Sequence, residues 1–128
     1  MSTQSALKHF EPVADEMNDL IVDSIQDIKG KNILKLNLTQ LDDAPTDFFI
    51  ICEGDSTTQV RAMSENIRKR MKEELGQMPL HVEGAMHSRW ICMDYFNVVV
   101  HIFHKDVRGV YELEDLWGDA VFTSYENL

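Results

Sequence analysis

Long hydrophobic runs and cysteines are scarce in this 128-residue sequence. No apolar stretch approaches the roughly 20 residues that a membrane-spanning helix needs, and the first residues, MSTQSALKHFEP, lack the basic-then-apolar order of a signal peptide. The two cysteines, Cys52 and Cys92, each lie inside an apolar stretch, where a free thiol behaves as a small buried hydrophobe. We therefore expect a cytoplasmic protein that makes no contact with a membrane.

Positive charge is also scarce, because 12 Lys and Arg stand against 22 Asp and Glu and leave a net charge of -10. Such a charge repels a polyphosphate backbone at long range and attracts basic proteins. Nucleic acid is thereby disfavoured as the main partner. A local phosphate contact stays open, since five basic residues fall within twelve positions: Arg61, Arg68, Lys69, Arg70 and Lys72. A solvated helix face is the simpler interpretation of that stripe.

The hydrophobic periodicity predicts a single α/β domain with a mixed sheet of about five strands and flanking helices. We expect helices from Pro12 to before Gly30, from Ser56 or Thr57 to Gly76, and over 106–117, with strands at 32–38, 48–52, 79–83, 89–95 and 97–104. The first strand should be wet on one face, the second covered on both, and the last two joined as a hairpin.

Three further expectations concern the connection between strands, the bounds of the domain and the charge of the first helix. The succession of strand, helix and strand over 48–83 predicts a right-handed crossover between parallel neighbours. The domain should span 12–120, with a flexible extension at 1–11 and a tail at 121–128. Aspartates recur every four residues along the first helix, at Asp15, Asp19, Asp23 and Asp27. They form either a solvated face or a docking surface for a basic partner.

The stretch EGDSTTQV at 53–60 joins a strand to a helix, as a phosphate-binding loop does. It lacks the second glycine and the lysine of a Walker loop and the partner glycines of a dinucleotide fingerprint, and Glu53 and Asp55 would repel an anion. We expect Gly54 to form the turn and Asp55, Ser56 or Thr57 to cap the helix.

Metal binding and catalysis find little support in the residue pattern. Five histidines are present, and His81 and Glu83 share a strand face, but no tight ligand pair such as HExxH or CxxC occurs. His101 is expected to be a core or partner-facing imidazole bonded to a neighbour. Asp47 and Asp94 could approach across the sheet, yet no motif for phosphate or nucleophile chemistry accompanies them. We expect no catalytic residue, cofactor or metal.

An interaction surface is the stronger prediction. Strand alternation places Trp90, Cys92 and Asp94 on one face, opposite Tyr95. The hairpin tip carries Tyr95 and Phe96, although turns favour small polar residues. Aromatic residues beside an acidic group are typical of interface anchors. The alternative is that Trp90 packs under a helix.

Three segments together resemble the ribosomal silencing factor (Iojap-like) family. They are TDFFIICEGDSTTQVRAMSENI, PLHVEG and WICMDYFNVVVHIFHKDVRGVYELEDLWGDA, and the resemblance covers about residues 17 to 120. It implies a non-enzymatic translation repressor that binds the large ribosomal subunit through its basic ribosomal protein number fourteen and sterically blocks joining of the small subunit. It also implies a nucleotidyltransferase-like fold without the catalytic equipment.

The resemblance also implies a docking surface, made of Trp90, Asp94, Tyr95 and His101 with Glu83, Gly84 and Phe96 nearby; Asp47 and Trp117 match family positions too. Tyr95 can contribute beside Trp90 only if it turns at the hairpin tip, and Trp117 could equally lock the last helix onto the sheet. Family members often have a glycine and an acid where this chain has Phe96 and Asn97. Three alternatives or additions stay open: a nucleotidyltransferase-like enzyme or nucleotide-binding module, a homodimer through the same edge, and a minor contact of the basic stripe with ribosomal RNA.

Overall fold

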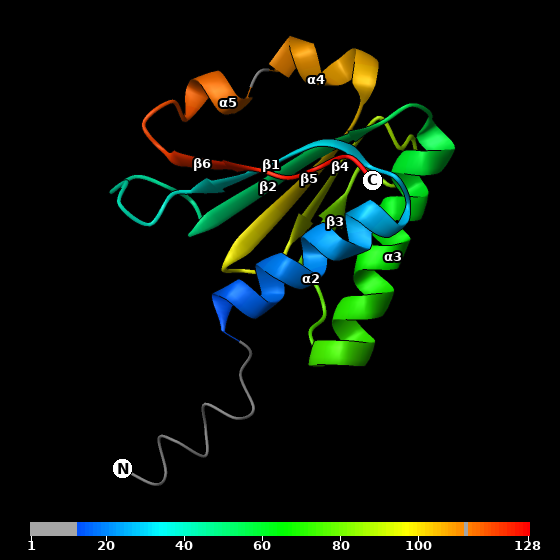
Figure 1. The fold of residues 1–128 in the computed structure, drawn as a ribbon, viewed down its shortest axis with the longest axis horizontal. Coiled ribbons are helices and arrows are strands. Elements are labelled where there is room, and N and C mark those ends of the chain that lie inside the picture. The colour runs from blue at the N-terminus through cyan, green and yellow to red at the C-terminus, as the bar shows by residue number, and fades with distance from the viewer. Residues whose placement is uncertain (1–12, 112) are drawn as a thin grey trace, which may run out of the picture.

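A six-stranded mixed sheet forms the centre of the structure, with strands in the order β3-β4-β5-β2-β1-β6 (Figure 1). The computed structural model describes residues 13–111 and 113–128. The strands are β1 Lys31–Asn37, β2 Phe48–Gly54, β3 His81–Glu83, β4 Trp90–Asp94, β5 Val98–His104 and β6 Val121–Ser124. Only the β2–β5 pair is parallel among them. The α/β class is thus confirmed, while the predicted extension at 1–11 lies outside the described residues.

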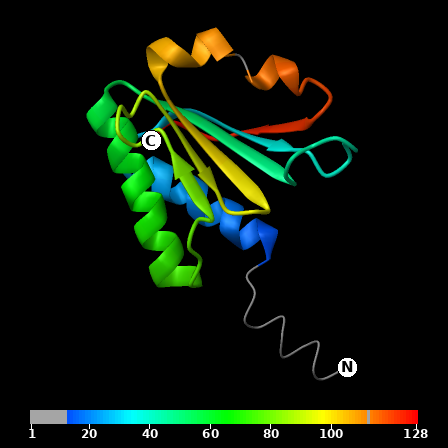
Figure 2. The same ribbon diagram turned by 180° about the vertical axis from the view of Figure 1, so that it is seen from behind.

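Helices cover the sheet on both sides (Figures 1 and 2). On one side lie α2 (Ala14–Asp27) and α3 (Thr57–Leu75), and on the other lie α4 (Lys105–Tyr111) and α5 (Leu113–Leu116). The helix predicted over 106–117 is wrong in its bounds, because α4 begins at Lys105 and α5 ends at Leu116; residue 112 between them lies outside the described residues. Pro12, predicted in the first turn of α2, lies outside the described residues.

Strand β2 joins the two halves of the core. Phe48, Ile50 and Cys52 pack on the side of α2 and α3, while Phe49 and Ile51 pack on the side of α4 and α5. The prediction of a strand covered on both faces is confirmed. Burial raises the pKa of the Cys52 thiol to about 12, so this cysteine stays protonated and behaves as an apolar side chain.

Two predictions about the sheet are wrong. Strand β3 pairs with β4 and not with β2, so the connection through α3 passes over two strands instead of joining parallel neighbours. Strand β6 pairs antiparallel with β1, where we expected a tail, and it brings the number of strands to six.

Strand β1 also departs from expectation on its second face. Leu34 and Leu36 share a face as alternation predicts, but Ile33 is buried in the core beneath α2 and α3. A register irregularity between Lys31 and Leu34 accompanies this change. Neither face of the strand is therefore exposed to solvent along its whole length, contrary to the prediction of one solvent-exposed face.

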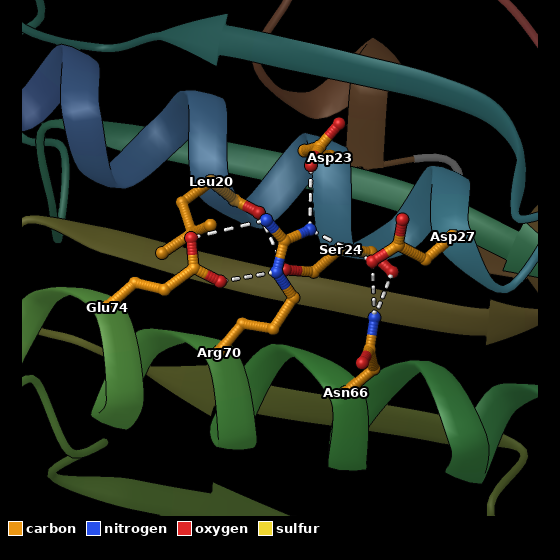
Figure 3. A network of polar contacts seen from close by, with 7 residues as sticks. All are labelled: Leu20, Asp23, Ser24, Asp27, Asn66, Arg70 and Glu74. Carbon is orange, nitrogen blue, oxygen red and sulfur yellow. Dashed lines mark hydrogen bonds and ion pairs between the residues drawn. The ribbon is translucent and has the colours of Figure 1, made fainter.

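Half of the acidic row on α2 has a structural use (Figure 3). Arg70 on α3 donates to Asp23 at 2.7 Å and to Asp27 at 2.9 Å, and it also pairs with Glu74 one turn along its own helix at 2.6 Å. Three carboxylates and their hydrogen bonds stabilise the charged guanidinium and raise the pKa of Arg70 above its usual value. Because one arginine bridges two helices, the network fixes α3 against α2.

The loop before α3 is a helix cap, as predicted. Ser56 Oγ accepts a hydrogen bond from the Gln59 amide at 3.1 Å, and Gln59 Oε1 accepts one from the Asp55 amide at 2.7 Å. Lys31 donates to Asp55 at 3.0 Å and lowers the pKa of that carboxyl. The first-turn donors that would cradle a phosphate are thus partly occupied by the protein's own side chains.

Candidate functional site

Register places the predicted interaction residues in adjacent rows across β3, β4 and β5. One row contains Glu83, Cys92 and His101, and the next contains His81, Asp94 and Val99. Residues directly opposite in an antiparallel pair project from the same side of the sheet. We call this set the open face: His81, Glu83, Cys92, Asp94, Val99 and His101, with Trp90 at its end.

The open face is on the side of α4 and α5 but is not buried like the rest of that side. His81 and Glu83 are exposed, and Cys92 and Asp94 are partly exposed. His81 Nε2 and Glu83 Oε1 lie 2.7 Å apart, which confirms that alternation puts both on one face. Two carboxylates therefore stand on a partly apolar strip, and nothing in the described part of the chain neutralises Asp94 with an ion pair.

Trp90 and His101 form the inner border of the open face. Trp90 Nε1 donates to His101 Nδ1 at 3.1 Å, and the Trp90 ring stacks on Phe103 at a centroid distance of 4.9 Å. The predicted imidazole bonded to a neighbour is confirmed. Trp90 also packs against the core beside α4, as the alternative interpretation proposed, so it supports the face as well as borders it.

The imidazole of His101 has a definite protonation state. An indole N–H can only donate, so Nδ1 is the acceptor and the neutral ring has its proton on Nε2. Burial lowers the pKa of His101 to about 4, which keeps the ring neutral near pH 7. His101 Nε2 has no hydrogen-bond partner among the described residues.

The hairpin tip separates the two aromatic residues that were predicted there. Tyr95 is buried with Ile91 and Met93 on the opposite side of the sheet, whereas Phe96 is 63% exposed. Tyr95 does not turn outward, so its ring is not available to a partner. Burial raises the pKa of its hydroxyl to about 12.

The remaining predicted residues have structural positions around the open face. Gly84 follows β3 with φ +87°, and a Cβ there would lie 2.0 Å from the carbonyl oxygen of Trp90. Asp47 is exposed just before β2, with β5 between it and β4. The Trp117 ring meets Phe49 edge to face at 6.0 Å, so it locks the segment after α5 onto the sheet.

Three residues in or beside the open face were not predicted as site residues: His81, Val99 and Thr46. His81 and Val99 belong to the row of Asp94, and the alternation of His81 with Glu83 was the available signal for His81. Thr46 is buried and donates to the carbonyl oxygen of Phe96 at 2.7 Å, a contact that no sequence pattern indicates.

The predicted basic stripe on α3 is divided among different roles. Arg61 donates to the carbonyl oxygens of Ala85 and Met86, and so holds the loop after β3. Arg61 and Arg68 line a cavity of about 470 Å³ beside this loop, and Lys72 is exposed. The stripe is therefore not a uniform cationic surface.

No group of three or more His, Cys, Asp or Glu side chains within residues 13–111 and 113–128 is arranged to hold a metal ion. Over the same residues, none of the helices is long and apolar enough to cross a membrane.

A family model described as "Ribosomal silencing factor during starvation" matches residues 11–128. The chain belongs to the ribosomal silencing factor family. A ribosomal silencing factor of Halalkalibacterium halodurans is 38% identical over 113 residues, which cover 88% of this chain and 95% of the relative. A crystal structure of a Chromobacterium violaceum protein is similar with a TM-score of 0.79 and 33% identity, covering 84% of this chain and 88% of that one.

A more distant relative in the mouse is named "Mitochondrial assembly of ribosomal large subunit protein 1". It is 35% identical over 74 residues, which cover 56% of this chain and 32% of the mouse protein. The predicted resemblance is thus confirmed, and the ribosomal silencing factor family is one of regulatory proteins rather than enzymes.

Proposed function

We propose that this ribosomal silencing factor acts in the cytoplasm by binding the large ribosomal subunit with its open face, and that it thereby blocks joining of the small subunit. The partner on the subunit is its basic ribosomal protein number fourteen. The observation that supports the proposal is an acidic and aromatic strip on β3–β5 that stays partly exposed although the rest of its sheet side is buried.

The charge of the face favours a basic partner. Glu83 and Asp94 project from adjacent rows, and the whole chain has a net charge of -10. Complementary charge raises the rate of encounter and sets the orientation of the complex, while apolar contact at the centre supplies most of the affinity. Both ingredients are present along the rows from Glu83 to His101.

The layered fold gives the docked domain enough thickness to obstruct a second surface. When the open face contacts a partner, α2 and α3 stand on the far side of the sheet (Figure 1). A helix layer lies roughly 10 Å from the sheet it covers and is itself about 10 Å thick, so the docked domain projects by on the order of 20 Å. A layer of that thickness prevents close contact between two subunit surfaces.

Gradient sedimentation tests the proposal with purified large and small subunits mixed under joining conditions. We expect the wild-type protein to migrate with the large subunit and to reduce the joined peak. If the protein stays at the top of the gradient and the joined peak is unchanged, the proposal is wrong.

Charge variants then locate the surface. Glu83→Lys combined with Asp94→Asn should weaken binding at least about tenfold, because it reverses one charge and removes another at the contact. Asparagine at position 94 retains the Oδ1 acceptor that the hairpin uses. Glu73→Lys on exposed α3 is the control, since it alters net charge like the first substitution without touching the open face. Equal weakening by both variants would show a non-specific charge effect.

Two predictions from the sequence remain beside this proposal. A nucleotidyltransferase-like enzyme or nucleotide-binding module would show saturable binding of Mg²⁺-nucleotide near Gly54 and Asp47, and a flat calorimetric titration would dismiss it. A homodimer through the open face would compete with the ribosome, and a dimer-stabilising crosslink that leaves ribosome binding intact would contradict that competition.

A further inference from the structure

The hairpin between β4 and β5 ends in a strained turn centred on Phe96. The backbone of Phe96 has φ +76°, and the Asn97 amide donates across it to the Tyr95 carbonyl oxygen at 3.0 Å. A γ-turn with a positive central φ is the rare and strained kind, and a bulky aromatic residue in that region is an outlier. Glycine would adopt this conformation without a steric penalty.

Two side chains hold the strained turn in place. Asp94 Oδ1 accepts a hydrogen bond from the Phe96 amide at 2.7 Å, and Thr46 Oγ1 donates to the Phe96 carbonyl at 2.7 Å. The amide and the carbonyl group of Phe96 are thus each bonded to a side chain, and the two side chains come from different parts of the chain. Strain of this sort persists where the surroundings over-determine it, and it concentrates at functional sites.

The side chain at the centre of the turn does not serve the core of the protein. Phe96 is 63% exposed, whereas Tyr95 beside it is 5% exposed and packed in the core. The conformation therefore holds a large aromatic side chain in solvent, immediately beside the Asp94 end of the open face. A smaller residue would close the same hairpin with less strain.

We propose that Phe96 is the anchor of the docking surface and that its ring inserts into an apolar pocket of a basic protein partner. This inference rests on the proposed function and names the residue that gives the contact its affinity. Two hydrogen bonds fix the backbone that carries the ring, and an aromatic side chain has few rotatable bonds, so little conformational freedom is lost on binding, which is the usual property of an interface anchor. Asp94 then has two tasks, since one oxygen holds the turn and its charge faces the partner.

Charge selects a basic protein as the occupant rather than a second copy of the chain or RNA. A second copy would bring its own Glu83 and Asp94 toward an identical acidic face, and the net charge of -10 opposes both self-association and a phosphate backbone. A basic protein surface with an apolar pocket matches both the ring and its acidic neighbours.

The test uses two variants that both remove the ring but differ in strain. Phe96→Ala keeps a Cβ at the positive φ, while Phe96→Gly removes it. We expect both to weaken binding to purified large subunits at least about tenfold. We also expect Phe96→Gly to have the higher urea midpoint, which reverses the usual order because alanine normally stabilises relative to glycine.

Phe122→Ala is the matched control, because Phe122 is the other exposed phenylalanine among the described residues and lies on β6 at the far edge of the sheet. It should bind like the wild type. If Phe96→Ala binds normally while Glu83→Lys weakens binding, the anchor is wrong and the proposed function stands. If the wild type does not bind the large subunit at all, the proposed function itself fails.

Three other results would overturn the anchor. If Phe122→Ala weakened binding to the large subunit as much as Phe96→Ala does, the loss would follow from removing any exposed apolar side chain. Equal urea midpoints for Phe96→Ala and Phe96→Gly would remove the strain on which the inference depends. A change in the sedimentation coefficient of the free protein on Phe96→Ala would show that the ring meets a second copy of the chain.

Discussion

Acid should destabilise this protein through one buried imidazole. Burial lowers the pKa of His101 from an ordinary value of 6.5 to about 4, and its surroundings are the rings of Trp90, Phe49 and Phe103. Cys92, directly opposite on β4, is uncharged because its own pKa rises to about 11. Glu83 and Asp94 lie on the same face, but among the described residues neither forms an ion pair with His101, and burial alone accounts for the shift.

The sign and size of the effect follow from proton linkage. As pH falls, the unfolded chain binds this proton first, so stability is complete above pH 6.5 and declines toward the folded pKa of about 4. The whole interval corresponds to roughly 3 kcal/mol, and at pH 5 the loss amounts to about 2 kcal/mol.

Urea unfolding followed by circular dichroism measures this loss. The wild type and His101→Gln should be compared at about pH 7.5 and about pH 5, because carboxylates contribute equally to both proteins and cancel in the comparison. The variant should lose about 2 kcal/mol less than the wild type between the two pH values. His87→Gln, at an exposed position, controls for loss of a histidine as such. Equal losses in wild type and His101→Gln would refute the assignment.

Three substitutions test the scaffold. Arg70→Met removes the cation that bonds three carboxylates of α2 and α3. It should lower the free energy of unfolding by about 1 kcal/mol at low salt and by less at high salt, which urea midpoints measure. A loss that does not depend on salt would contradict an ionic role. Ser56→Ala removes the cap of α3 and should cost about 1 kcal/mol in thermal unfolding, unlike Ser56→Gly, which should cost only tenths. Gly84→Ala combines φ +87° with a Cβ 2.0 Å from the Trp90 carbonyl and should cost more than about 2 kcal/mol; an unchanged melting temperature would disprove that contact.

Local periodicity was sufficient for most elements and for the sides of the sheet. Alternation correctly opposed Trp90 to Tyr95, and the short spacing between β4 and β5 correctly predicted a hairpin. Strand β6 was not predicted because the segment VFTS is short and does not alternate between apolar and polar residues. It forms a strand by pairing with β1, where Leu34 lies opposite Ser124. The position of β3 in the sheet was also not predicted, because strand order depends on pairing between segments that are distant in the sequence.

The candidate docking residues were predicted from their chemistry and from the family resemblance, but their accessibility could not be predicted. Both Tyr95 and Phe96 were candidates; alternation placed Tyr95 opposite Trp90, but the turn geometry was needed to show that Tyr95 stays buried while Phe96 beside it is exposed. The bond from Thr46 that holds this turn comes from 50 residues away in the chain. A contact at such a separation leaves no local signature.

The central parallel pair of the sheet affects how the protein folds during its synthesis. Every partner in the β2–β5 ladder is separated by the same stretch of chain, from Phe48 with Val98 to Gly54 with His104. Ladders between distant segments close late and slowly, because a long loop must be ordered before the contacts repay it. During synthesis the first half of the chain must therefore wait for β5 to emerge. The open face, which needs β4 and β5 side by side, therefore cannot form before β5 has left the ribosome.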